Sequence, residues 1–126
     1  RNAPRGYVQV YRFQGNAWTA KGSRIDGDSA RDQFGWDVSL SRDGDTLAVT
    51  ALRGGEQDRG YTRVYESVND EWSRLGPNLV EEMQEGRFST SVALSGNGHS
   101  VAVGATAFET TTTTQGYVEV YNVGRN

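Results

Sequence analysis

Side chains that could act as acids, bases or nucleophiles occur along this sequence without a catalytic spacing. His99 is the only histidine, and no nucleophile or second metal ligand stands near it in the sequence. The acidic pairs Asp70-Glu71 and Glu81-Glu82 could perform general acid–base chemistry. Because the two members of each pair are adjacent, we expect their carboxylates to point apart into solvent.

The serines and glycines carry no catalytic signature either. Ser39, Ser41 and Ser95 lie in alternating apolar and polar stretches, and they lack the spacing of a nucleophile elbow. The glycines fall at the ends of such stretches, whereas a phosphate-binding loop needs them between a strand and a helix. We therefore predict that the chain has no catalytic site and no enzymatic activity.

The composition excludes several classes of protein. The 126 residues include 13 Lys and Arg against 16 Asp and Glu, and a net charge of -3 argues against nucleic-acid binding. No apolar run approaches the roughly 20 residues that a membrane-spanning helix needs. Cysteine is absent, which excludes disulfides and thiolate metal sites. The aromatic content of 10% argues against disorder.

A repeat accounts for most of the sequence. The segment Gly6–Tyr11 (GYVQVY) recurs as Gly60–Tyr65 (GYTRVY) and as Gly116–Tyr121 (GYVEVY), at spacings of 54 and 56 residues. Other pairs keep the spacing of 54: Trp18 with Trp72, Gly22 with Gly76, Phe34 with Phe88, and Leu47-Ala48-Val49 with Val101-Ala102-Val103. A fixed offset over so many positions indicates repeated structural units.

Each repeat is predicted to form short antiparallel strands. Residues 61–66 alternate with period two, and the apolar run Leu47-Ala48-Val49 is typical of a strand buried on both faces. Asp43-Gly44 and Asn97-Gly98 are hairpin-turn signals. A fourth strand is expected over residues 71–75, matching 17–21. No segment shows a convincing helical period, so the fold is predicted to be all-β.

Four antiparallel strands per repeat predict β-propeller-type blades. Residues 1–33 would hold the third and fourth strands of one blade, 34–87 a complete blade and its connection, and 88–126 the first three strands of another. That makes about two and a quarter blades, whereas a closed propeller needs at least about four. We therefore expect the segment to belong to a longer propeller or to assemble with other copies, and to be oligomeric or poorly stable alone.

The residues that carry these strands resemble an FG-GAP repeat. Phe34-Gly35 opens the first strand, VSLSRDG (residues 38–44) and Leu47–Ala51 follow, and the later copy carries Gly104-Ala105. Similar repeats build the integrin alpha-subunit propeller and many secreted or surface proteins. The resemblance implies a non-catalytic extracellular or cell-surface scaffold or adhesion module, with other blades, proteins or glycans as partners. The later copy departs from the pattern at Phe88-Ser89.

The same resemblance implies a calcium loop between the first two strands of a blade. Here those loops are residues 41–46 and 95–100, and both are short and lack the leading and closing carboxylates of the family. Asp43 and Asp45 are the candidate ligands. Because calcium takes six to eight oxygen ligands, we expect a polar hairpin turn here and no cofactor.

Two features could contact other molecules or carry a modification. Most aromatic residues repeat, so we expect them to pack between blades. Trp36 stands apart from them, since its counterpart is Thr90; it is the first candidate for stacking on a sugar ring, together with Arg53. The run Thr110, Thr111, Thr112, Thr113 and Thr114 is either a polar loop or an O-glycosylation site. Two alternatives to the scaffold stay open: a glycan-binding propeller, and the accessory propeller of a larger secreted enzyme.

Overall fold

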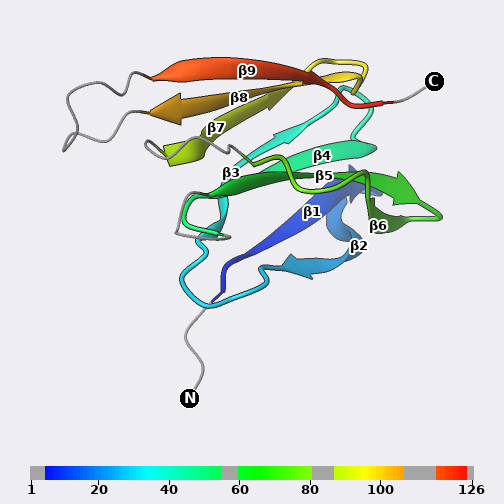
Figure 1. Ribbon diagram of the computed structural model, residues 1–126. Helices are drawn as coiled ribbons and strands as arrows, with labels where there is room; N and C mark the ends of the chain where they lie inside the picture. The colour runs from blue at the N-terminus through cyan, green and yellow to red at the C-terminus, as the bar shows by residue number, and fades with distance from the viewer. Residues whose placement is uncertain (1–4, 55–59, 81–86, 107–115, 125–126) are drawn as a thin grey trace.

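The computed structural model describes residues 5–54, 60–80, 87–106 and 116–124, with only the backbone described for residues 87–89. These residues form nine β-strands and no helix (Figure 1). The strands are β1 (Tyr7–Gln14), β2 (Ala17–Asp26), β3 (Phe34–Leu40), β4 (Thr46–Ala51), β5 (Tyr61–Val68), β6 (Glu71–Arg74), β7 (Arg87–Leu94), β8 (Ser100–Thr106) and β9 (Tyr117–Asn122). Over the described ranges, there is thus no helix that is long and apolar enough to cross a membrane.

The strands form three antiparallel sheets, which we call sheets A, B and C. Sheet A pairs β1 with β2, sheet B has the order β3-β4-β5-β6, and sheet C has the order β7-β8-β9. Sheet B is therefore a complete four-stranded antiparallel blade. The predicted all-β class with blades of the propeller type is confirmed.

Tight hairpins connect the third and fourth strands of the first two units. The β1–β2 turn is Gly15-Asn16 and the β5–β6 turn is Asn69-Asp70, and all four residues have positive φ. This conformation is that of the turns whose twist matches the flanking strands. β2 is longer than predicted, because it continues past Lys21 to Asp26 opposite the start of β1.

The three sheets stack face to face, with sheet B in the middle (Figure 1). β5 serves both interfaces because its side chains alternate between the two faces. Tyr61 and Tyr65 join a buried cluster that includes Val8 and Val10 of sheet A. Val64 points to the opposite face and joins the cluster shared with sheet C.

β4 lies at the centre of this stack. Every residue of β4 is buried, which confirms that the run Leu47-Ala48-Val49 is covered on both faces. Leu47 and Val49 face sheet A, whereas Ala48 faces sheet C beside Val101 and Val103. Burial of this strand therefore requires a sheet on each side.

Candidate functional site

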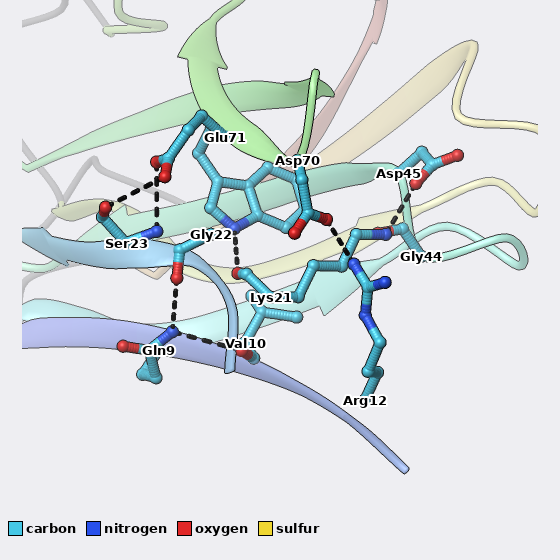
Figure 2. A network of polar contacts seen from close by, with 11 residues as sticks. Gln9, Val10, Arg12, Lys21, Gly22, Ser23, Gly44, Asp45, Asp70 and Glu71 are labelled. Carbon is cyan, nitrogen blue, oxygen red and sulfur yellow. Dashed lines mark hydrogen bonds and ion pairs between the residues drawn. The ribbon is translucent and has the colours of Figure 1, made fainter. Parts of the chain in front are cut away.

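Sheets A and B meet at a group of charged side chains (Figure 2). The Arg12 guanidinium pairs with the Asp70 carboxylate. Lys21 Nζ lies 2.6 Å from Asp45 Oδ1 and donates a hydrogen bond of 2.7 Å to the Gly44 carbonyl. These residues line a cleft of about 560 Å³ between the two sheets. Because exposed ion pairs contribute only about 0–1 kcal/mol each, we infer that they orient the sheets more than they stabilise them.

The neighbouring contact joins β2 to β6. The carboxylate of Glu71 accepts hydrogen bonds from the backbone N–H and the hydroxyl of Ser23, at 3.1 and 3.2 Å (Figure 2). Asp70 and Glu71 therefore point to different partners on sheet A. The expectation that their carboxylates lie apart is correct, but both are bound by sheet A and neither is simply solvated.

Trp72 is the largest side chain at this interface. Its Nε1 donates a hydrogen bond of 2.9 Å to the Lys21 carbonyl, and its ring packs against the buried cluster of sheets A and B. A Cβ atom at Gly22 would lie 2.7 Å from Trp72 Cδ1, and Gly22 has a φ of 75°. Position 22 therefore has two separate reasons to be glycine.

Arg63 is a buried charge on the face of β5 that meets sheet A. It donates hydrogen bonds of 2.8 Å to Asp28 and 2.7 Å to Asn78 Oδ1. The hydrogen bond from Arg63 lowers the pKa of the Asp28 carboxyl below 3.8 despite partial burial. Burial alone would lower the pKa of Arg63, but the hydrogen bonds to Asp28 and Tyr65 raise it. Arg63 therefore stays charged, and Asp28 is the group that neutralises it.

Tyr61 lies beside Arg63, whose guanidinium carbon is 4.7 Å from the centre of the Tyr61 ring. The Tyr61 hydroxyl is buried and has no hydrogen-bond partner among the described residues. Burial raises the pKa of Tyr61 to about 12, although the positive charge of Arg63 opposes this shift. The ring thus stabilises the interface while its hydroxyl is left unsatisfied.

Sheets B and C are joined by side chains that bind backbone. Asp37 Oδ2 accepts a hydrogen bond of 2.9 Å from the Val92 N–H, and Ser39 Oγ accepts one of 2.9 Å from the Leu94 N–H. The β3 side chains thus bind alternate N–H groups along β7. This arrangement fixes the register between two strands that belong to different sheets.

The β3–β4 and β7–β8 turns share one hydrogen-bonding pattern. Asp43 Oδ1 accepts hydrogen bonds from Ser41 Oγ at 2.8 Å and from the N–H two residues further on at 2.9 Å. Asn97 Oδ1 accepts the corresponding bonds from Ser95 Oγ at 2.8 Å and a following N–H at 2.9 Å. In the β7–β8 turn the neutral amide oxygen of Asn97 takes the place of the Asp43 carboxylate oxygen. The turn therefore does not require a negative charge at position 43.

The two candidate calcium ligands therefore have different partners, because Asp43 binds its own turn and Asp45 pairs with Lys21. In the part of the chain that the structure describes, no group of three or more His, Cys, Asp or Glu side chains is placed to hold a metal ion. The expectation that no cofactor binds here stays a prediction, supported by these contacts.

The two candidate ligand contacts, Trp36 and Arg53, are both exposed. Trp36 lies on β3 with 54% of its surface exposed, and its backbone N–H donates to the Gln33 carbonyl. Arg53 follows β4, where its N–H donates to the Asp32 carbonyl. No described contact joins the Trp36 and Arg53 side chains.

Two other candidates lie outside the described residues: the acidic pair Glu81-Glu82 and the threonine run 110–114. His99 is an exposed turn residue at the start of β8, and its carbonyl accepts a hydrogen bond from Val123. Among the described residues it belongs to no group of three or more His, Cys, Asp or Glu side chains that could hold a metal ion.

Sequence reasoning missed the residues that hold the sheets together. No motif marks Asp28, Asp37 or Ser39 as interface residues, and their partners across the interfaces, Arg63, Val92 and Leu94, lie 35 or 55 residues away in the sequence. The one signal available was the repeat itself, since Trp72 and Gly22 both belong to it. No protein family model matches the chain, and no curated protein matches it significantly.

Proposed function

We propose that this chain is a non-catalytic interaction module of FG-GAP-like blades, whose two outer sheet faces bind further blades of the same kind. These blades would come from the same polypeptide or from another copy. The proposal includes the extracellular or cell-surface location that the family resemblance implies.

The observation that carries the proposal is the difference in exposure between repeat counterparts. Tyr61 and Tyr65 are 2% and 5% exposed because they face sheet A, whereas their counterparts Tyr7 and Tyr11 are 58% and 57% exposed. In the same way Trp72 packs against sheet A, whereas its counterpart Trp18 is exposed. The outer face of sheet A thus presents the same aromatic types that sheet B buries.

The outer face of sheet C shows the converse. Val64 of β5 is buried against sheet C, whereas its counterpart Val120 and the neighbouring Val118 are exposed on β9. The β1 residues Val8 and Val10, which occupy the equivalent positions, are buried because sheet B covers them. The outer face of sheet C therefore exposes valines at the same repeat positions as Val8 and Val10, through which sheet A packs on sheet B.

The two outer faces thus belong to one type of interface. The A–B interface joins a valine face of one sheet to a tyrosine face of the next. The valine face of sheet C and the tyrosine face of sheet A are the two halves of the same pairing. Large exposed apolar patches on small proteins usually mark binding surfaces.

Sedimentation velocity of the 126-residue chain at increasing concentration tests this proposal. We expect association that Val120→Lys and Tyr11→Glu each weaken, because either charge would be desolvated in the contact. Ser73→Ala is the control, since Ser73 is an exposed residue of β6 in sheet B, the middle sheet, and lies on neither outer face. A well-folded monomer at low micromolar concentration, unaffected by either variant, would contradict the proposal.

A second candidate function is glycan binding, which the exposure of Trp36 favours. Trp36 is a single exposed aromatic ring on β3 whose repeat counterpart is Thr90. Exposed indole rings stack on the apolar faces of sugars. A glycan array probed with the chain and with Trp36→Ala tests this alternative, and binding that survives the substitution would exclude Trp36 as the contact.

A further inference from the structure

A groove of about 110 Å³ opens between sheets B and C beside the end of β9. It is lined mainly by apolar side chains: Val64, Leu75, Leu79, Val101, Tyr121 and Val123. The groove contrasts with the charged cleft between sheets A and B, although both lie at an interface between successive repeats. The corresponding position between sheets A and B is occupied by Trp72, which indicates what the groove can bind.

The groove is the repeat counterpart of the place where Trp72 binds sheet A. Trp72 donates its indole N–H to the Lys21 carbonyl and packs on Gly22. The counterparts of Lys21 and Gly22 are Leu75 and Gly76, and both line the groove. A Cβ atom at Gly76 would meet nothing within 4 Å, whereas one at Gly22 would clash with the indole.

The side of the groove that β9 forms also corresponds to the site that Trp72 occupies. Trp72 lies opposite Ser67 in the β5–β6 ladder. The counterpart of Ser67 is Val123, which follows β9 and forms a wall of the groove. In the described residues β9 pairs only with β8, so its outer edge carries no further strand.

The groove is more apolar than the site that Trp72 occupies. Leu75 replaces Lys21, Pro77 replaces Ser23 and Val123 replaces Ser67. Burying an indole against such a surface removes a large apolar area from water. Leu75 is the repeat counterpart of Lys21, whose carbonyl accepts the Trp72 N–H, so we expect the Leu75 carbonyl to be the acceptor for the polar end of the ring.

We propose that the outer edge of β9 and this groove bind an extended, tryptophan-bearing strand of the β6 type. The strand adds antiparallel to β9 in the register of β6 on β5, so that its tryptophan lies opposite Val123. The indole then packs on Gly76 and donates its N–H to the Leu75 carbonyl. Main-chain pairing supplies part of the affinity and the indole supplies the specificity, as in other cases of strand addition.

This site goes beyond the proposed stacking of sheet faces, because it uses a strand edge and a side-chain groove. The two can fail separately. Sedimentation that does not depend on concentration would contradict only the stacking of outer sheet faces. A strand peptide that does not bind would contradict only the groove site.

A peptide that copies residues 69–76 (NDEWSRLG) is the direct probe. Fluorescence anisotropy of the labelled peptide, titrated with the 126-residue chain up to about 1 mM, should show saturable binding. The same peptide carrying Trp72→Ala should bind at least about tenfold more weakly, as is usual for a buried aromatic anchor. No saturable binding, or equal binding of both peptides, would overturn the proposal.

Two variants of the chain locate the site. Val123→Trp fills the groove with an indole from its own wall and should abolish binding of the peptide. Val118→Trp is the matched control. It adds the same ring to β9 at a residue that is exposed and does not line the groove. Binding that Val123→Trp leaves intact would overturn the proposal.

A measurement on the unsubstituted chain makes the test independent of how Val123→Trp folds. Amide resonances of Leu75, Gly76 and Asn122 should shift on addition of the peptide, whereas those of Gly15 and Asn16 should not. Shifts confined to other parts of the chain would show that the peptide binds elsewhere and would overturn the assignment of the groove.

Discussion

Asp37 of β3 accepts a hydrogen bond of 2.9 Å from the backbone N–H of Val92 in β7, so one side chain joins two sheets. Its second carboxylate oxygen accepts a hydrogen bond of 2.9 Å from the Val38 N–H. The carboxylate is therefore held from its own strand while it binds the next sheet. Sheets B and C owe part of their mutual position to this residue.

We expect Asp37→Ala to lower the free energy of unfolding by about 1–3 kcal/mol, because the Val92 N–H would lose its partner in a partly buried place. Urea denaturation followed by circular dichroism measures the change. Ser91→Ala is the control, since Ser91 is the exposed repeat counterpart of Asp37 and should shift stability by less than about 0.5 kcal/mol. Equal effects of both substitutions would contradict the role of Asp37.

Gly22 and Gly76 offer a matched pair for testing the Trp72 contact. Both have positive φ, 75° and 79°, so alanine costs backbone strain of similar size at each position. Only at position 22 does the added Cβ meet the indole of Trp72. We expect Gly22→Ala to be more destabilising than Gly76→Ala by about 1–3 kcal/mol, and equal losses in denaturant unfolding would argue against this packing.

Tyr61→Phe should stabilise the protein by about 1 kcal/mol at neutral pH, because it removes a buried hydroxyl without a partner and keeps the ring. The variant should also change the alkaline limit of stability. Burial raises the pKa of Tyr61 to about 12 in the folded state, above about 10 in the unfolded state. The folded state therefore loses stability as pH rises from about 10 to 12, and Tyr61→Phe should lack this part of the loss in thermal melts.

Asp28→Asn tests the acid side. The hydrogen bond from Arg63 lowers the pKa of Asp28 below 3.8 in the folded state, so its contribution is present above that value and is lost as pH falls through the lower, folded pKa. The variant should be less stable at pH 7, because buried Arg63 loses its carboxylate, and should lose less further stability on acidification. Asp26→Asn, at an exposed residue of β2, controls for the change in net charge. Parallel pH profiles for the chain and for Asp28→Asn would contradict this pairing.

The strands and the fold class could be predicted because each repeat contains signals of local structure. The period-two alternation of residues 61–66, the apolar run of β4 and the Asp-Gly and Asn-Gly turns each act within a few residues. Such signals are readable in a single sequence. They correctly predicted an all-β chain and a four-stranded blade in its middle.

The same repeat could not predict burial or the contacts between sheets. Tyr61 and Tyr7 have the same type and the same place in their strands, yet only Tyr61 has a sheet in front of it. Asp37 binds sheet C through a position where the next repeat has Ser91. Residues that join unlike neighbours therefore differ between copies, and a search for self-similarity passes over them.

On β1, β5 and β9, which are the third strands of their repeats, the tyrosines and the valines point to opposite faces of the sheet. The stack of sheets therefore has a direction. A tyrosine face meets only a valine face, so the contact is heterologous and cannot be satisfied by a two-fold axis. A chain whose valine face is blocked can still receive a neighbour on its tyrosine face, and it would then act as a terminator of growth. Two chains that are blocked on opposite faces, when mixed, should form a dimer that grows no further, because the open tyrosine face of one binds the open valine face of the other and both remaining faces are blocked.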